Sequence, residues 1–251
     1  MNAVELLGEV LVITAAAGVG GTGLGGLTAC LFRRDSSRAV SLLLSFAAGV
    51  MTAVVCFDLL ADAVSPEGGQ LFLAVPGILL GCAVTSSLNA WIGRRSGTGH
   101  GLFLAGLVMA AAIALHNVPE GMVIGTSFAR GAVHPATARS GIMMAVVIGL
   151  HNIPEGMAVA VPLISGGMGR ARAAGAAALT GAPTVLGALL GFCLGTLGPT
   201  SLTLALSFAS GAMLYVVFGE LLPESALMWR SKAPALAAVL GIITGMVIVY
   251  A

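Results

Sequence analysis

Two short segments of the chain combine histidine, asparagine, proline and glutamate in the same order. HNVPEG covers residues 116–121, and HNIPEG covers residues 151–156. In each segment the histidine and the glutamate are four residues apart, which places both side chains on one face of a helix. Imidazole and carboxylate together form a borderline ligand set that suits Zn²⁺, Fe²⁺ or Mn²⁺. The duplicated motif therefore predicts a site for a divalent metal cation.

The motif also offers weaker donors beside the histidines. Pro119 and Pro154 remove backbone donors inside the two predicted helices and free the carbonyls one turn earlier. The alternative is a pair of kinked helices whose histidine and glutamate only bond each other. Because asparagine and proline recur in register, we favour the metal site. The predicted ligands are His116, Glu120, His151 and Glu155, with Asn117 and Asn152 as neutral oxygen donors.

The chain around the two motifs has the composition of a membrane protein. Of its 251 residues, 58% are hydrophobic and 8% are charged, whereas about 25% are charged in a typical soluble domain. So little charge cannot cover the surface of a soluble globule. The net charge of +1 gives no basic face for a nucleic-acid partner. The four cysteines are scattered without a CxxC pair, so they indicate neither a disulfide framework nor a thiolate zinc site.

Apolar runs between charged or Gly/Pro breaks predict eight transmembrane helices. A helix needs about 20 apolar residues to cross a bilayer, so eight leave no room for an extramembrane domain. We therefore expect an all-α polytopic membrane protein with one transmembrane domain over residues 1–251. The predicted spans cover residues 5–31, 38–62, 70–93, 101–128, 138–164, 172–195, 200–224 and 233–250.

The basic residues predict how the chain is oriented. Nine of them lie in or beside the connections after the first, third, fifth and seventh spans, and only Arg130 and Arg139 lie in the others. Short loops rich in Lys and Arg stay in the cytoplasm. Both termini are therefore expected outside. The nine are Arg33, Arg34, Arg38, Arg94, Arg95, Arg170, Arg172, Arg230 and Lys232.

A second internal repeat relates the second and seventh predicted spans. Residues 45–63 align without gaps on residues 207–225, an offset of 162, with Asp58 opposite Glu220 and Asp62 opposite Glu224. The two spans cross the bilayer in opposite directions, as do the two motif spans. Inverted repeats are typical of carriers that expose one midplane site alternately to each side.

The carboxylates of this repeat are candidate pathway residues. Asp58 is expected near the outer end of its span, and Glu220 and Glu224 near the inner end of theirs. They could draw cations into one mouth and out of the other. The alternative, that they are ordinary helix-end carboxylates in contact with water, stays open.

With HNVPEG and HNIPEG on adjacent spans and SGAMLYVVFGELLPES on the seventh, the chain resembles the ZIP (Zrt-, Irt-like protein) family of metal transporters. The resemblance implies an eight-helix 3+2+3 bundle with both termini outside, which moves Zn²⁺ and related cations such as Fe²⁺, Mn²⁺ or Cd²⁺ into the cytoplasm. These ions are cargo, and no cofactor is expected.

The resemblance to the ZIP family also implies a main site of His116, Glu120, His151 and Glu155, with Asn117 and Asn152 turned toward a second, adjoining site. The connection RRSGTGHG is short, as in bacterial members, so the bacterial inner membrane is expected. Whether the chain forms a homodimer is left open.

One departure from the family concerns the sixth span. Many members carry a Glu-Pro pair whose glutamate completes the second site, whereas this chain reads TGAPTVLGA. Depending on the alignment, Ala182 or Thr184 occupies the glutamate position, and neither is a carboxylate. One metal is therefore expected to dominate, although Glu120 or Glu155 could still bridge two ions.

A membrane-embedded metalloenzyme, such as an intramembrane protease, is the competing function. Metal-assisted hydrolysis needs an open coordination position and a placed general base. The sequence has no HExxH motif, and the two ligand pairs are alike, with no separate base beside them. We therefore expect a carrier and not an enzyme.

Overall fold

The computed structural model describes residues 3–31, 37–64, 71–95, 102–133 and 140–250. These residues form helices and short turns, and no strand occurs among them. Eight helical spans in this part of the chain are long and apolar enough to cross a membrane. The predicted all-α class and the eight spans are thus confirmed.

Four of the eight spans are continuous helices, and four are built from shorter pieces. The predicted edges agree to within a few residues, except that the fourth span continues to Val133 where the prediction ended it at 128. In chain order, the spans are α1 (Ala3–Ala15), η1 (Ala16–Gly20) and α2 (Gly21–Leu31); α3 (Ser37–Val54), η2 (Val55–Leu59) and α4 (Leu60–Ala63); α5 (Leu71–Arg95); α6 (Leu102–Val133); α7 (Ser140–Ser165); α8 (Arg170–Thr180) and α9 (Pro183–Thr196); α10 (Pro199–Val216), η4 (Val217–Leu221) and α11 (Leu222–Met228); and α12 (Ala233–Tyr250).

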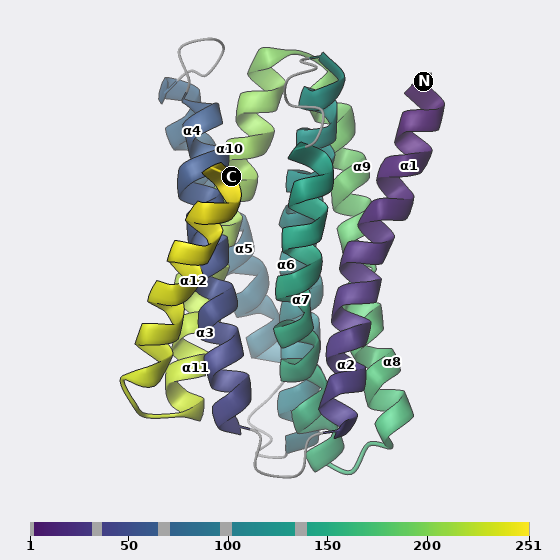
Figure 1. Ribbon diagram of the computed structural model, residues 1–251, viewed down its shortest axis with the longest axis vertical. Coiled ribbons are helices and arrows are strands. Elements are labelled where there is room, and N and C mark those ends of the chain that lie inside the picture. The colour runs from purple at the N-terminus through teal and green to yellow at the C-terminus, as the bar shows by residue number, and fades with distance from the viewer. Residues whose placement is uncertain (1–2, 32–36, 65–70, 96–101, 134–139, 251) are drawn as a thin grey trace.

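Successive spans run in opposite directions along one bundle (Figure 1). The first span therefore begins, and the eighth ends, toward the same end of the molecule. We call this the upper end, as it is drawn in Figure 1, and the opposite one the lower end. The middle of α6 and of α7, where the two motifs lie, is far from both ends.

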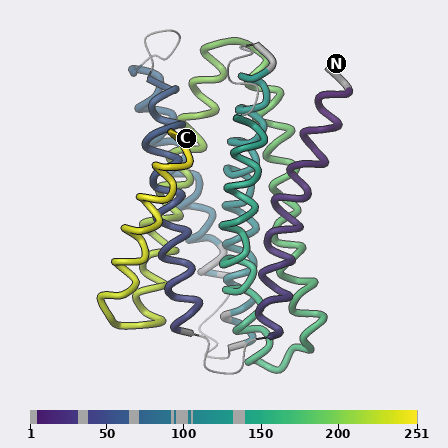
Figure 2. The backbone as a smooth tube through the Cα atoms, viewed as in Figure 1, coloured from purple at the N-terminus to yellow at the C-terminus, as the bar shows by residue number. Residues whose placement is uncertain are grey.

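The spans pack most extensively as two groups of four. The motif group consists of spans one, four, five and six, with α6 against α9 and α7 against α2. The partner group consists of spans two, three, seven and eight, with α12 against α3 and α10 against α5. Figure 2 shows α12 beside α3 on one side of the bundle and span one beside span six on the other. Between the groups, α10 lies against α6 and α3 against α7.

Glycines bring the helices of the motif group close together. A Cβ at Gly25 of α2 would overlap the carbonyl oxygen of Ile153, and one at Gly187 of α9 would overlap that of Val118. Small residues at such positions let helix backbones approach closely, which is how membrane helices gain packing energy. Spans one and six are therefore held tightly against the helices that carry the motifs.

Two π-helical segments lie at matching positions of the 45–63 and 207–225 repeat. They are η2, Val55–Leu59, and η4, Val217–Leu221, and they carry Asp58 and Glu220. The π turns are rare and occur frequently at functional sites. The matched irregularity supports an internal repeat, whereas the 3+2+3 arrangement stays a prediction.

Candidate metal site

The four predicted ligands lie at the middle of the bundle, two on α6 and two on α7. Their exposed fractions are 2% for His116, 0% for Glu120, 5% for His151 and 0% for Glu155. Ionisable side chains in the apolar middle of a membrane protein carry a large desolvation cost and mark functional sites.

The histidines and glutamates pair across the two helices. His116 Nε2 lies 3.4 Å from Glu155 Oε1, and His151 Nε2 lies 3.0 Å from Glu120 Oε1. The four-residue spacing makes this crossed pairing possible, because it directs each histidine and glutamate of one helix toward the same neighbour. The two motifs are therefore brought together as predicted.

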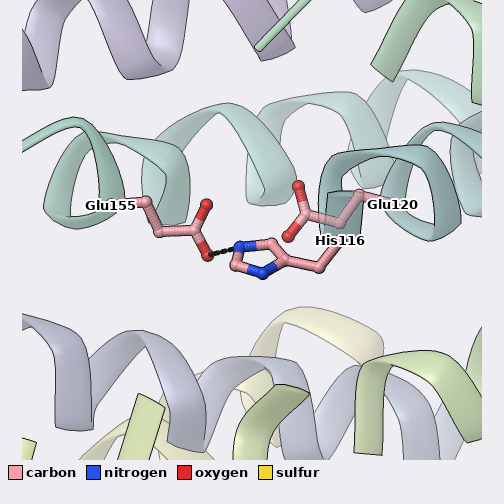
Figure 3. Close-up of side chains that lie close together, drawn as sticks. All are labelled: His116, Glu120 and Glu155. Carbon is pink, nitrogen blue, oxygen red and sulfur yellow. Dashed lines mark ion pairs between the residues drawn. The ribbon is translucent and has the colours of Figure 1, made fainter. Parts of the chain in front are cut away.

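Three of these side chains form a compact group of ligand atoms. One atom from each of His116, Glu120 and Glu155 lies within 4.8 Å of the other two. Figure 3 shows the two α6 side chains and the α7 glutamate pointing toward one another. Zn²⁺ binds imidazole nitrogen and carboxylate oxygen at about 2.0–2.2 Å, so the ligand atoms of a tetrahedral site lie about 3.4 Å apart. A small inward movement would close this group around a cation.

Hydrogen bonding leaves much of the group unsatisfied. Within the described residues, no hydrogen-bond partner exists for either oxygen of Glu155, for Oε2 of Glu120, for either ring nitrogen of His116 or for Nδ1 of His151. Buried polar atoms are normally paired, and a buried carboxylate without partners is costly. A divalent cation would supply the missing interactions, so the donor set fits a metal ion.

Glu220 lies closer to the metal site than its sequence position indicated. Its Oε2 is 3.9 Å from His116 Nδ1, on the side of the ring opposite the nitrogen that faces Glu155. η4 directly follows α10, the helix of the partner group that packs against α6. Glu224, one turn further toward the lower end, is half-buried in α11.

The two asparagines bond to backbone carbonyls of the neighbouring spans. Asn117 Nδ2 donates to the carbonyl of Thr180 (2.8 Å), and its Oδ1 accepts from the Thr184 hydroxyl (3.2 Å). The Thr180 carbonyl is available because the Thr184 N–H bonds to Gly181 instead, at the break between α8 and α9. Both ends of the Asn117 amide are thus engaged by span six.

Asn152 is held by span one in a similar way, with one difference. Its Nδ2 donates to the carbonyl of Ala17 (3.2 Å) in the π-helical segment η1. Its Oδ1 is buried and has no hydrogen-bond partner among the described residues. Asn152 therefore keeps a free oxygen, whereas Asn117 does not.

Thr184 lies next to the candidate site, a point that the sequence interpretation left undecided between Thr184 and Ala182. It is fully buried next to Asn117, whereas Ala182 is exposed. The sequence held a signal for this, because Thr22, Leu24, Gly25 and Leu27 recur as Thr184, Leu186, Gly187 and Leu189 at the same offset of 162. That match identifies Thr184 as the inward-facing position of the sixth span.

Arg130 is a second residue whose role the sequence interpretation missed. It was assigned to a connection, but it lies in the last turn of α6 and forms ion pairs with Asp58 (3.6 Å) and Asp62. Acidic partners within the bundle compensate the arginine charge. Arg130 therefore lies within α6, which continues to Val133, and not in a connection.

A bundle of eight membrane-spanning helices with buried, crossed His–Glu pairs at its centre defines a polytopic metal-transport protein. The family model described as "ZIP Zinc transporter" matches residues 93–251, which include both motifs. The chain belongs to the ZIP family of zinc transporters.

Bacterial relatives match along most of the chain. Zinc transporter GufA of Myxococcus xanthus is 33% identical over 235 residues, 87% of this chain and 89% of GufA. Zinc transporter ZupT of Corynebacterium glutamicum is 33% identical over 250 residues, 90% of this chain and 91% of ZupT. Both are named as transporters, and this agrees with the expectation that the chain is not an enzyme.

An animal relative matches over a shorter region. Zinc transporter ZIP11 of Bos taurus is 38% identical over 174 residues, 69% of this chain. The aligned region spans 48% of that protein, about half its length.

Proposed function

We propose that this transporter carries Zn²⁺ or a related divalent cation through one site formed by His116, Glu120, His151 and Glu155. The observation that supports the site is the crossed pairing of buried imidazoles and carboxylates, most of whose nitrogen and oxygen atoms have no hydrogen-bond partner among the described residues. A mixed nitrogen and oxygen donor set suits Zn²⁺, and it also accepts Fe²⁺ and Mn²⁺. Cd²⁺ is a further cation to test.

The amides divide into two roles under this proposal. Asn152 has a free Oδ1 and can add a neutral oxygen to the cation. Asn117 acts as a positioning residue, because span six engages both ends of its amide. Since Thr184 also replaces the carboxylate of a second site, one cation occupies the middle of the bundle.

We infer the orientation of the chain in the membrane from the described basic side chains. Those of Arg38, Arg94, Arg170, Arg172, Arg230 and Lys232 all belong to the lower ends of their spans or to the connections there. Because Lys- and Arg-rich loops stay cytoplasmic, the lower end faces the cytoplasm and both termini lie outside. The extensive matches to bacterial proteins support the plasma membrane of a bacterium.

The pathway follows the two π-helical segments. A hydrated cation enters at the upper end near Asp58 of η2 and exchanges water for the four ligands at the centre. Glu220 of η4 lies beside His116 and provides the next carboxylate toward the lower end, followed by Glu224. The motif group, which holds the ligands, moves against the partner group, which holds these carboxylates, and so opens each side in turn.

Uptake into proteoliposomes tests the proposal. Purified protein is reconstituted, and the entry of Zn²⁺, Fe²⁺, Mn²⁺ and Cd²⁺ is measured with and without a pH gradient. We expect uptake of Zn²⁺ that requires the protein and saturates with concentration. Absence of metal uptake by correctly folded protein would reject the proposal. The mass of the protein purified in detergent tests whether two copies pair.

A further inference from the structure

An ionic cluster at the upper end joins α6 to the second span. Arg130 NH2 lies 3.6 Å from Asp58 Oδ1, and Arg130 also pairs with Asp62. The exposed fractions are 14% for Arg130, 16% for Asp58 and 36% for Asp62. Arg130 donates a further hydrogen bond to the hydroxyl of Ser140 at the start of α7 (3.3 Å). The guanidinium is therefore held by three side chains from two spans, the second and the fifth.

This cluster lies above the metal site and connects the two helix groups. Arg130 follows Glu120 on the same helix by ten residues, about 15 Å at 1.5 Å per residue. Ser127 lies between them on the same helical face, since it follows Glu120 by seven residues and precedes Arg130 by three. Asp58 and Asp62 belong to the partner group. The ion pairs thus tie the moving groups together between the upper end and the site.

Among the described residues, the lower end shows no matching cluster. The repeat places Glu220 and Glu224 opposite Asp58 and Asp62, but within the described residues neither forms an ion pair with a lysine or arginine. The residue of α7 that corresponds to Arg130 at the motif offset of 35 is Ser165, which carries no charge. The carboxylates of the repeat are therefore paired with an arginine at the upper end, whereas at the lower end no described lysine or arginine pairs with them.

We propose that Arg130 is a positioning residue that keeps the upper side of the transport path closed. Its ion pairs hold span four against span two above the ligands, so the upper side opens only when the guanidinium leaves Asp58 and Asp62. When Arg130 leaves, the negative charges of Asp58 and Asp62 lose their partner, and a cation that arrives from the upper side can neutralise them. The arrival of the cation therefore favours the open upper side. This proposal rests on the proposed transport function.

Accessibility of a single cysteine tests the closure directly and without metal transport. Cys30, Cys56, Cys82 and Cys193 are replaced by alanine, and Ser127→Cys is introduced below the cluster. An impermeant methanethiosulfonate reagent is applied from the upper side, and the labelling rate is measured in metal-free buffer. The variants are Arg130→Gln, the charge swap Arg130→Asp with Asp62→Arg, and Arg170→Gln as a matched control at the lower end.

We expect Arg130→Gln to label about tenfold faster than the parent, because removing the ion pairs shifts the population toward the open upper side. The charge swap restores an ion pair and should label as slowly as the parent, as should Arg170→Gln. Equal rates for Arg130→Gln and the parent, or a fast rate for the charge swap, would overturn the proposal. Failure of the proposed function would instead appear as missing metal uptake by the parent protein.

Discussion

His151 of α7 lies 3.0 Å from Glu120 of α6, although each histidine has a glutamate only four residues away on its own helix. The reciprocal pair, His116 with Glu155, is separated by 3.4 Å. Each helix therefore contributes one half of each pair. Separating α6 from α7 would dismantle the whole donor set, so transport must move these two helices together.

Removing one ligand should abolish transport. We expect His116→Ala or Glu155→Ala to lower the rate of Zn²⁺ uptake by at least about 100-fold, because the remaining donors no longer match the cation. Glu9→Ala, which removes an exposed carboxylate from α1, serves as the control and should transport normally. Both ligand variants should still reach the membrane as folded protein. Near-normal uptake by both would rule out this site.

The Thr184 position should decide how many ions are bound. Metal analysis of the unmodified protein should give one cation per chain at the centre. Thr184→Glu places a carboxylate beside Asn117. This variant should bind a second cation more tightly, because an added negative charge in a low-dielectric site holds cations firmly. Ala182→Glu is the matched control. It should not increase the binding of a second cation, since Ala182 is exposed. Two fully occupied ions in the unmodified protein would refute the single-site prediction.

Glu220 should affect the release of the cation more than its binding. We expect Glu220→Gln to lower the maximal uptake rate about tenfold while KM changes little, because the residue contacts His116 from the partner group. Glu224→Gln, one turn further from the site, should have a smaller effect. A change confined to KM in Glu220→Gln would show that this carboxylate helps to bind the cation instead.

The close helix packing of the motif group predicts strong effects of small substitutions. Gly25→Ala and Gly187→Ala each force a methyl group onto a neighbouring carbonyl, so each should destabilise the fold by about 1–3 kcal/mol. Gly20→Ala adds its methyl group in open space and is the control. Thermal unfolding of the purified variants in detergent measures the difference. Equal stability of all three variants would mean that the helices can separate without cost.

The orientation can be tested at the two ends of the chain. With the four native cysteines removed, Asn2→Cys and Ala251→Cys should both react with an impermeant thiol reagent applied outside the cell. The expectation follows from the basic side chains at the lower end. Labelling of one end alone would require an odd number of spans.

The sequence was sufficient to predict the spans and the meeting of the two motifs, because apolar run length and the HNxPEG spacing each have a direct structural meaning. It could not predict the direction of the asparagine side chains. That direction depends on the carbonyls that become free at the break after Thr180 and at the π turn near Ala17. Such interruptions arise from packing between spans that are far apart in the sequence.

Arg130 shows a second limit of sequence interpretation. As an isolated charge near the end of an apolar run, it indicated a connection. Its partners, Asp58 and Asp62, lie about 70 residues earlier in the chain, so no local pattern could pair them. Only the folded structure, in which the Arg130 side chain meets the two aspartates of span two, reveals the cluster.

Anomalous X-ray scattering at the zinc edge tests the central claim most directly. Crystals grown with Zn²⁺ should show one strong peak between α6 and α7, at about 2.0–2.2 Å from imidazole and carboxylate atoms of both motifs. The same peak should be lost in Glu155→Ala. A zinc peak elsewhere in the bundle, with none between the two motifs, would contradict the account.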